Sequence, residues 1–519
     1  MYNEDKTSAY LRQRLDSIAI SYQGMPARGS RRRPVEQHLR VILEVCDGDK
    51  SPPLSAAGFL RHQGACYGVT PPAANFRFFE SPEESTENAS SANSQHDKEL
   101  PVTAAQNGNW WSMAASIYLG TMGVAALNWP HAMASLTWVG GVITNVLAFF
   151  ISFYTLYEML EMHEMKGRRC NRYRELGRLA FGAKGPFICG ALQYGALVAI
   201  VISYLVICGE SMHAFYNIVC RGDCPAYGRS AWIATVGCVS LLLGIVPNMS
   251  SIKTFSALAA FAGVAYTAIG VGGSVSAGLH AERDTGHHAQ WNLDGRSTVG
   301  GIFEAWAAFG AFVYSYGTHA VVLECQAQIP SPSFRPALAG SIIGYLAAGF
   351  NMFSLAFAGY WAFGQSATEV IFLGTIPGPQ WMLALADLLV VVSLLGQWQL
   401  FIMPIFDAME GVLLNHISNL QRWQQLLVRV GFSVLITLIG VIFPFFGDFA
   451  QLVGAVAAVP NAFILPALIH QRVMKPPASS WRSWANWGIN GISMIVVVLG
   501  AAGSGRSTVL AAIHNDYFA

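Results

Sequence analysis

The stretch GTMGVAALNWP, residues 120–130, lies in the middle of an apolar run that extends from residue 111 to residue 135. A run of this length can cross the hydrocarbon core of a bilayer as a helix. Two glycines, Asn128 and Pro130 interrupt the run, and such residues weaken or remove helical hydrogen bonds. In a membrane, the freed backbone groups are tolerated only where they face protein or a cavity. The stretch therefore predicts an interrupted transmembrane helix that lines a binding site.

A second stretch of this kind, FGAFVYSYGTH, occupies residues 309–319 inside another apolar run. Eleven runs of about twenty residues or more are apolar enough to span a bilayer. They cover 111–135, 139–163, 187–218, 229–247, 254–279, 299–328, 336–363, 379–413, 425–445, 449–473 and 484–504. The interrupted runs are the first and the sixth, as expected for the leading helices of two inverted repeats of five. Glycines also serve as packing residues in membrane helices, but the matching positions favour breaks.

The composition indicates the same class of fold. Hydrophobic residues make up 53% of the 519 residues and charged residues only 12%, and the mean hydropathy is +0.39. We therefore predict an all-α membrane protein with eleven transmembrane helices, arranged as a five-plus-five inverted repeat plus one extra helix. A net charge of +1 gives no reason to expect a nucleic-acid partner. The sequence has no metal-ligand cluster, nucleophile elbow or phosphate loop, so we expect no enzyme activity, cofactor or metal.

The distribution of Lys and Arg predicts the orientation of the chain. With a cytosolic amino terminus, most of these residues outside the tail fall in loops on the inside, in agreement with the positive-inside rule. The densest basic loop, 166–184, fixes the first two spans, and its segment 173–181 has the pattern of an interfacial helix. The odd number of crossings then places the carboxyl terminus on the extracytosolic side.

The amino-terminal part of the chain differs from the rest. Residues 1–107 are rich in Arg, Glu, Ser and Pro and show little periodicity, so we predict a disordered cytosolic tail. The sequence indicates no protein partner for this tail. The transmembrane domain is expected at 108–515. Cys220 and Cys224 lie together in a predicted outside loop, as either a disulfide or two free thiols.

Broken helices supply polar backbone groups inside an apolar span, which a carrier of a polar solute needs. The amino terminus of a half-helix presents unpaired N–H groups and about half a positive charge, which suits a carboxylate. Carbonyl groups at the opposing end suit an ammonium group, so an amino acid fits the pair of breaks. The candidates for the rest of the lining, each of a type that also serves in packing, are Gln193, Tyr314, Tyr316, Gln397 and Trp398.

Ionisable residues inside membrane spans are costly and therefore informative. His319 directly follows the predicted break in the sixth span, and an unperturbed histidine has a pKa of about 6.5. Glu324 lies further along the same half-helix, and Asp387 lies within the eighth span. We predict that proton coupling involves residues from this group.

Longer motifs in the chain resemble one known family. They include Trp110-Trp111, Trp129-Pro130-His131-Ala132-Met133, the run 157–165, Arg172-Tyr173-Arg174-Glu175-Leu176-Gly177, Val246-Pro247-Asn248, Val321-Val322-Leu323-Glu324, Met403-Pro404-Ile405-Phe406-Asp407 and Trp484-Ala485-Asn486-Trp487. In this order they resemble the amino acid/auxin permease family, and most closely its plant lysine/histidine-transporter branch. The resemblance covers about residues 109–515.

The resemblance implies a LeuT-type fold and the import of amino acids together with protons by a multi-pass membrane protein. It places the substrate contacts on one group of residues at each break. These are Thr121, Met122, Gly123, Val124 and Ala125 in the first span, and Tyr314, Ser315, Tyr316, Gly317 and Thr318 in the sixth. The plasma membrane is the favoured location, with a vacuolar or endosomal membrane as the alternative.

The chain departs from the family pattern near both breaks. Ala125 and Asn128 stand where the family has glycines, and Ala311 replaces an acidic residue. The branch therefore does not define the substrate, and neutral or basic amino acids are the expected range. Two other functions remain open: a membrane sensor that binds amino acids without transporting them, and a carrier of auxin-like acids.

Overall fold

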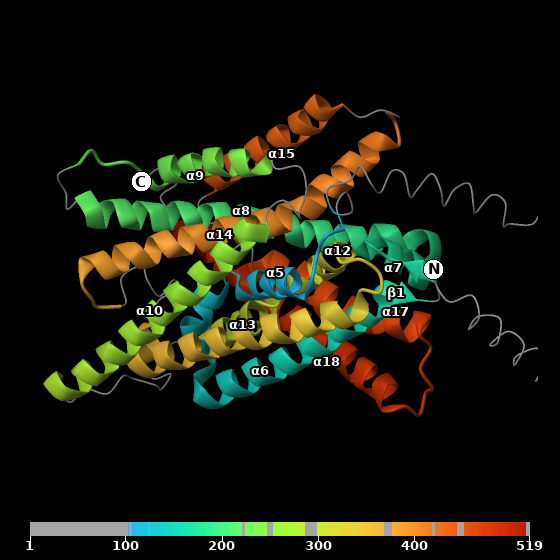
Figure 1. The fold of residues 1–519 in the computed structure, drawn as a ribbon. Helices are drawn as coiled ribbons and strands as arrows, with labels where there is room; N and C mark the ends of the chain where they lie inside the picture. The colour runs from blue at the N-terminus through green and yellow to red at the C-terminus, as the bar shows by residue number, and fades with distance from the viewer. Residues whose placement is uncertain are drawn as a thin grey trace, which may run out of the picture. The chain divides into compact units, whose positions relative to one another are not determined.

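The computed structural model describes residues 102, 106–123, 125–165, 167–220, 224–245, 253–285, 298–367, 376–417, 421–443 and 451–514. All of them belong to one compact unit, Glu83–Ala519. The predicted disordered tail at 1–107 lies almost wholly outside the described residues. Within the described ranges the fold is helical apart from one short hairpin (Figure 1).

The helices follow one another with short connections. The first part of the chain contains α5 Trp110–Met122, α6 Ala125–His163, α7 Tyr173–Phe181, α8 Gly185–Cys220, α9 Arg229–Gly244 and α10 Lys253–Thr285. The second part contains α11 Thr298–Tyr314, α12 Val322–Ala327, α13 Phe334–Phe363, α14 Gln380–Leu414, α15 Arg422–Ile442, α17 Leu465–Val473 and α18 Trp481–His514. Five short 3-10 or π-helical turns complete the described fold, namely η1 Gly182–Lys184, η3 Gly317–Ala320, η4 Gly364–Ser366, η5 Gly454–Ala458 and η6 Pro460–Ile464.

Eight helical spans in the described part of the chain are long and apolar enough to cross a membrane. Helix α9 and the part of α11 at 299–314 are apolar but shorter. Each of the eleven predicted runs contains helix, which confirms an all-α membrane protein. The number of eleven crossings stays a prediction.

The first predicted stretch is interrupted in the structure. Helix α5 ends at Met122 and α6 begins at Ala125, and Gly123 between them has a φ of −9° and a ψ of 175°, outside the helical region. Helix α6 then bends at Thr137, whose φ of 61° lies in the left-handed region that β-branched residues rarely adopt. The bend separates the end of the first predicted run from the second run.

The second predicted stretch is interrupted as well. Helix α11 ends at Tyr314, and after two residues outside helical structure the chain continues as η3 and α12. This stretch packs against the helix of the tenth run. That helix is irregular, since η5 and η6 consist of π-helical turns in place of regular α-helical turns. A Cβ atom added at Gly454 of η5 would lie 2.4 Å from the Tyr314 ring. Irregular helices from two parts of the chain therefore pack against each other beside the break.

Small residues allow the helices around the breaks to approach closely. A Cβ atom added at Gly344 of α13 would lie 2.4 Å from the Ala114 carbonyl oxygen of α5. One added at Gly503 of α18 would lie 2.3 Å from the Ala307 nitrogen of α11. Helices α8 and α14 pack against each other, and α14 also contacts α5 (Figure 1). These contacts fix the backbones that form the candidate site.

The basic loop between the second and third spans is ordered. It forms the antiparallel strands β1 Glu164–Met165 and β2 Arg168–Arg169, followed by α7 at the predicted position 173–181. The Arg169 guanidinium donates hydrogen bonds to the carbonyl groups of Gln326, Ala327 and Ile329. The loop therefore satisfies carbonyl groups at the end of α12, the half-helix that follows the second break.

The predicted cysteine pair is joined in the structure. Cys220, the last residue of α8, forms a disulfide with Cys224, and their Cα atoms are 5.5 Å apart. The bond ties Cys224, which precedes α9, to the end of α8. Disulfides form and persist in oxidising compartments, so this bond agrees with the predicted outside position of the loop.

Candidate functional site

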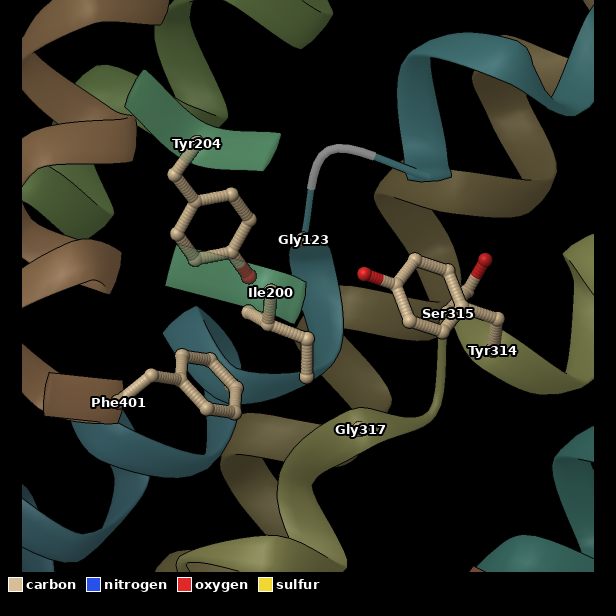
Figure 2. A pocket seen from close by; sticks show the side chains of 8 residues that line it. Gly123, Ile200, Tyr204, Tyr314, Ser315, Gly317 and Phe401 are labelled. Carbon is tan, nitrogen blue, oxygen red and sulfur yellow. The ribbon is translucent and has the colours of Figure 1, made fainter. Parts of the chain in front are cut away.

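A cavity lies between the two interrupted helices and the facing sides of α8 and α14 (Figure 2). Its lining residues are Gly120, Gly123, Ile200, Tyr204, Tyr314, Ser315, Gly317 and Phe401. Ile200 and Tyr204 come from α8, Phe401 comes from α14, and the others belong to the two broken segments. The wall therefore combines main chain at glycines with aromatic and aliphatic side chains.

Four of the predicted contact residues line this cavity: Gly123, Tyr314, Ser315 and Gly317. Thr121, Met122, Tyr316 and Thr318 are buried nearby but do not line it. Val124 and the side chain of Ala125 lie outside the described residues. The structure therefore divides the predicted residues into a group that lines the cavity and a group that supports it.

Two buried hydrogen bonds tie the two breaks together. The hydroxyl groups of Thr121 and Thr318 are 2.7 Å apart and share a hydrogen bond. The indole nitrogen of Trp129 donates a hydrogen bond of 2.7 Å to the Ser315 hydroxyl. Both bonds are fully buried, so water does not compete with them. These two bonds hold the broken segments against each other.

Sequence reasoning missed the wall that faces the breaks. Ile200, Tyr204 and Phe401 lie in long apolar helices without a polar interruption, and nothing in the local pattern separates them from lipid-facing or packing residues. The Tyr204 hydroxyl points toward the first break, where a Cβ atom added at Gly123 would lie 3.2 Å from it (Figure 2). Tyr204 thus defines how much space the glycine leaves open.

Three predicted candidates for the lining have other roles. Gln193 donates hydrogen bonds to the Ala320 carbonyl at 2.6 Å and to the Glu324 carboxylate at 2.9 Å. Gln397 donates to the Ser393 hydroxyl on its own helix. Trp398 is fully buried. None of these residues lines the cavity.

Helix ends at the two breaks add backbone polar groups to the hydroxyl-bearing side chains of Tyr204, Tyr314 and Ser315 in the lining. At the first break, the carbonyl end of α5 meets the amino end of α6, so groups without intrahelical partners gather around Gly123. At the second break, the carbonyl end of α11 lies at Tyr314. An amino end attracts anions and a carbonyl end attracts cations. The breaks therefore place groups that suit a carboxylate close to groups that suit an ammonium group.

The predicted ionisable residues are buried but lie in different places. Both ring nitrogens of His319 are engaged, with Nδ1 at 3.1 Å from the Tyr316 carbonyl and Nε2 at 3.0 Å from the Thr155 hydroxyl. One Glu324 oxygen accepts from Gln193, and the other has no hydrogen-bond partner among the described residues. Asp387 is 3% exposed on α14, and its Oδ1 likewise lacks a partner there. None of the three lines the cavity.

We expect the bond between Thr121 and Thr318 to contribute measurably to stability. Replacing either residue by valine should lower the free energy of unfolding by about 1 kcal/mol, because one buried hydroxyl loses its partner. The double variant should cost less than the sum of the two single variants, because no hydroxyl is then left unpaired. Denaturation of the purified protein in mixed micelles measures all three. Additive single effects would show that the two hydroxyl groups are not coupled.

Known proteins match most of the chain. A family model described as transmembrane amino acid transporter protein matches residues 106–510. Lysine histidine transporter-like 1 of Arabidopsis thaliana is 29% identical over 432 residues, which cover 81% of this chain and 93% of that protein. Lysine histidine transporter-like 3 of the same plant is 31% identical over 392 residues, 73% of this chain and 84% of that protein. Amino acid permease 6 of Arabidopsis thaliana is 26% identical, over 77% of this chain and 90% of that protein.

Solved structures share the arrangement of the helices. MhsT in complex with L-phenylalanine is 11% identical with a TM-score of 0.52, over 77% of this chain and 99% of that one. MHP1, a nucleobase-cation-symport-1 family transporter in a closed conformation with bromovinylhydantoin bound, is 13% identical with a TM-score of 0.50, over 82% and 97%. At these identities the likeness shows the fold alone, and that fold is of the LeuT type predicted from the resemblance.

Proposed function

The chain belongs to the transmembrane amino acid transporter family, and on this premise we propose that it is a secondary carrier that moves amino acids together with protons. Members of this family transport amino acids and are not enzymes. The proposal adds the proton as the coupling ion and assigns the substrate to the cavity between the two breaks.

One observation supports the substrate site above the others: the cavity is formed where both interrupted helices meet. Its lining combines backbone at three glycines with the side chains of Ile200, Tyr204, Tyr314, Ser315 and Phe401. Backbone termini suit the charged carboxylate and ammonium groups that every amino acid shares. The side chains of the wall suit the variable part of the substrate. Neutral or basic amino acids remain the proposed range.

Within the helix bundle, we propose Glu324 first as the residue that binds the coupled proton. It is almost completely buried, and Gln193 connects it to the Ala320 carbonyl beside the second break. His319 and Asp387 are the other two candidates. One proton moving inward gains about 2.3 kcal/mol per 100 mV of membrane potential, and each pH unit adds about 1.4 kcal/mol. Coupling to one proton therefore sustains a substantial accumulation of substrate.

The proposed placement follows from the basic loops. The amino terminus and the loop from β1 to α7 face the cytosol, and the disulfide-bearing turn and the carboxyl terminus face the other side. The plasma membrane is the proposed location, with a vacuolar or endosomal membrane as the alternative. The domain assignment, with a cytosolic tail at 1–107 and a carrier domain at 108–515, belongs to the same proposal.

Uptake by the purified protein in liposomes tests the carrier function. A gradient of about one pH unit, acidic outside, should drive labelled neutral amino acids to about a tenfold accumulation at zero membrane potential. A protonophore should reduce the accumulation ratio to about one, because only the proton gradient drives it. Binding without uptake would instead favour a membrane sensor, and inhibition by auxin-like acids but not by amino acids would favour the other carrier function.

A further inference from the structure

A cluster of polar side chains lies away from the cavity, where the carboxyl end of α6 meets α17 and the amino end of α18. Its members are Tyr154, Glu158, Glu161, His470, Arg482 and Asn486. None of them lines the cavity between the breaks. Glu158 and His470 are 0% and 1% exposed, although both can carry a charge. Burial of such a pair needs an explanation, because an unbalanced buried charge is costly.

The geometry centres on a single contact between a carboxylate and an imidazole. His470 Nδ1 lies 3.1 Å from Glu158 Oε1. The same oxygen accepts hydrogen bonds of 2.9 Å from the Tyr154 hydroxyl and from the Asn486 amide. Asn486 Nδ2 also lies 3.2 Å from His470 Nδ1. Residues from three helices therefore converge on one buried pair.

The surroundings of the pair are compatible with two proton states. When Nδ1 is protonated, it donates to Glu158 Oε1. When Nδ1 is not protonated, it accepts from the Asn486 amide, which lies within reach of both partners. Glu158 Oε2 is buried and has no hydrogen-bond partner among the described residues, so it leaves a position for a proton on the carboxyl group. A structural ion pair would require only the first of these states.

The other charges of the cluster form a separate pair nearer the surface. Arg482 Nη1 lies 3.0 Å from Glu161 Oε2, and their side chains are 28% and 26% exposed. The same Glu161 oxygen lies 3.8 Å from Nε2 of His470. With Tyr154, these are the titratable or charged side chains that face the buried pair from α6, α17 and α18. Arg482 is thus paired with Glu161, separately from the inner pair of Glu158 and His470.

The ionisable side chains become more exposed from Glu158 and His470 to Glu161. Glu158 is fully buried, the His470 ring has one nitrogen on each side, and Glu161 is partly exposed. An imidazole can accept a proton at one nitrogen and release one from the other. The relay of Glu158, His470 and Glu161 lies beside the basic loop that begins at β1, which faces the cytosol in the proposed orientation.

We propose that Glu158 and His470 form a second proton site of the carrier, which passes the transported proton to the cytosol by way of Glu161. Glu158 begins protonated, and neutral His470 begins with its proton on Nε2. The Glu158 O–H bond breaks as Nδ1 takes that proton. The N–H bond at Nε2 breaks as its proton moves toward Glu161, 3.8 Å away, and Glu161 releases it to water, which leaves His470 protonated on Nδ1. No bond other than these O–H and N–H bonds changes. The inference rests on the proposed proton-coupled transport. It also links proton release to the packing of α6, whose first half forms part of the interrupted segment, against α17 and α18.

The test compares two kinds of transport by the full chain in liposomes. Net uptake driven by about one pH unit requires proton release, whereas exchange of labelled for unlabelled amino acid at equal pH does not. Glu158→Gln and His470→Gln should each lower the accumulation ratio from about ten to about one and leave exchange within about twofold of wild type. Glu158→Asp, which keeps the carboxyl group, should retain accumulation. Glu210→Gln, at a partly exposed carboxylate on α8, serves as the matched control.

The outcomes separate this inference from the proposed function. Wild-type accumulation in both glutamine variants would overturn the relay. If both variants lose exchange as well as accumulation, the cluster only supports the fold. That result would also overturn the relay. A wild-type protein that exchanges amino acids but never accumulates them would instead refute proton coupling itself.

Discussion

Replacing Gly123 by leucine is expected to abolish amino acid uptake. The glycine lines the cavity at the first break, and a Cβ atom there would already lie 3.2 Å from the Tyr204 hydroxyl. A leucine adds three further carbon atoms, which fill the space between the two broken segments and Tyr204. Displacing a binding geometry by about 1 Å costs on the order of 100-fold in rate, so we expect initial uptake to fall at least that far.

The control for this variant is Gly491→Leu. Gly491 lies in α18, is exposed in the structure, and has no atom within 4 Å of the position that a Cβ would take. Uptake by this variant should stay within about twofold of wild type, since surface substitutions usually have small effects. Both variants are compared at equal amounts of folded protein in the membrane. Normal uptake by Gly123→Leu would refute the assignment of the cavity as the substrate site.

The two breaks could be predicted because their signals are local. Glycine, proline and polar residues within an apolar span change the backbone wherever they stand, so one sequence is enough to locate 120–130 and 309–319. The helix at 173–181 was predicted for the same reason, from its own periodicity. The bend of α6 at Thr137 gave no such signal, because threonine favours extended or helical backbone.

The remaining parts of the site depend on contacts between distant residues. Ile200, Tyr204 and Phe401 are apolar or aromatic residues in apolar helices, and only the packing of α8 and α14 decides which of their faces meets the breaks. The pairing of Glu158 with His470 joins two residues that lie far apart in the sequence. A single sequence contains the residues of such pairs but not their distances.

Asp407→Ala is expected to have the largest effect on stability. Asp407 is 2% exposed and binds Arg172, with 2.6 Å between Oδ2 and Nε. It also accepts a hydrogen bond from the Val102 backbone. Without Asp407, the buried Arg172 keeps the weaker counter-charge of Glu175, whose carboxylate lies 3.3 Å away and is partly exposed. Breaking a buried ion pair by removing one partner costs about 3–5 kcal/mol. The free energy of unfolding, measured in mixed micelles, should fall by that amount.

Two further variants decide whether the expected loss of stability in Asp407→Ala is caused by the burial of the ion pair. Glu210→Ala breaks the exposed pair with Arg229, whose atoms lie 3.2 Å apart, and should cost less than about 1 kcal/mol because water screens the charges. Replacing Arg172 and Asp407 together by leucine should restore most of the stability lost in Asp407→Ala, since no buried charge is then left alone. Equal costs for Asp407→Ala and Glu210→Ala would mean that the buried pair does not hold the basic loop against α14. A double variant as unstable as the single one would place the cost in lost packing instead.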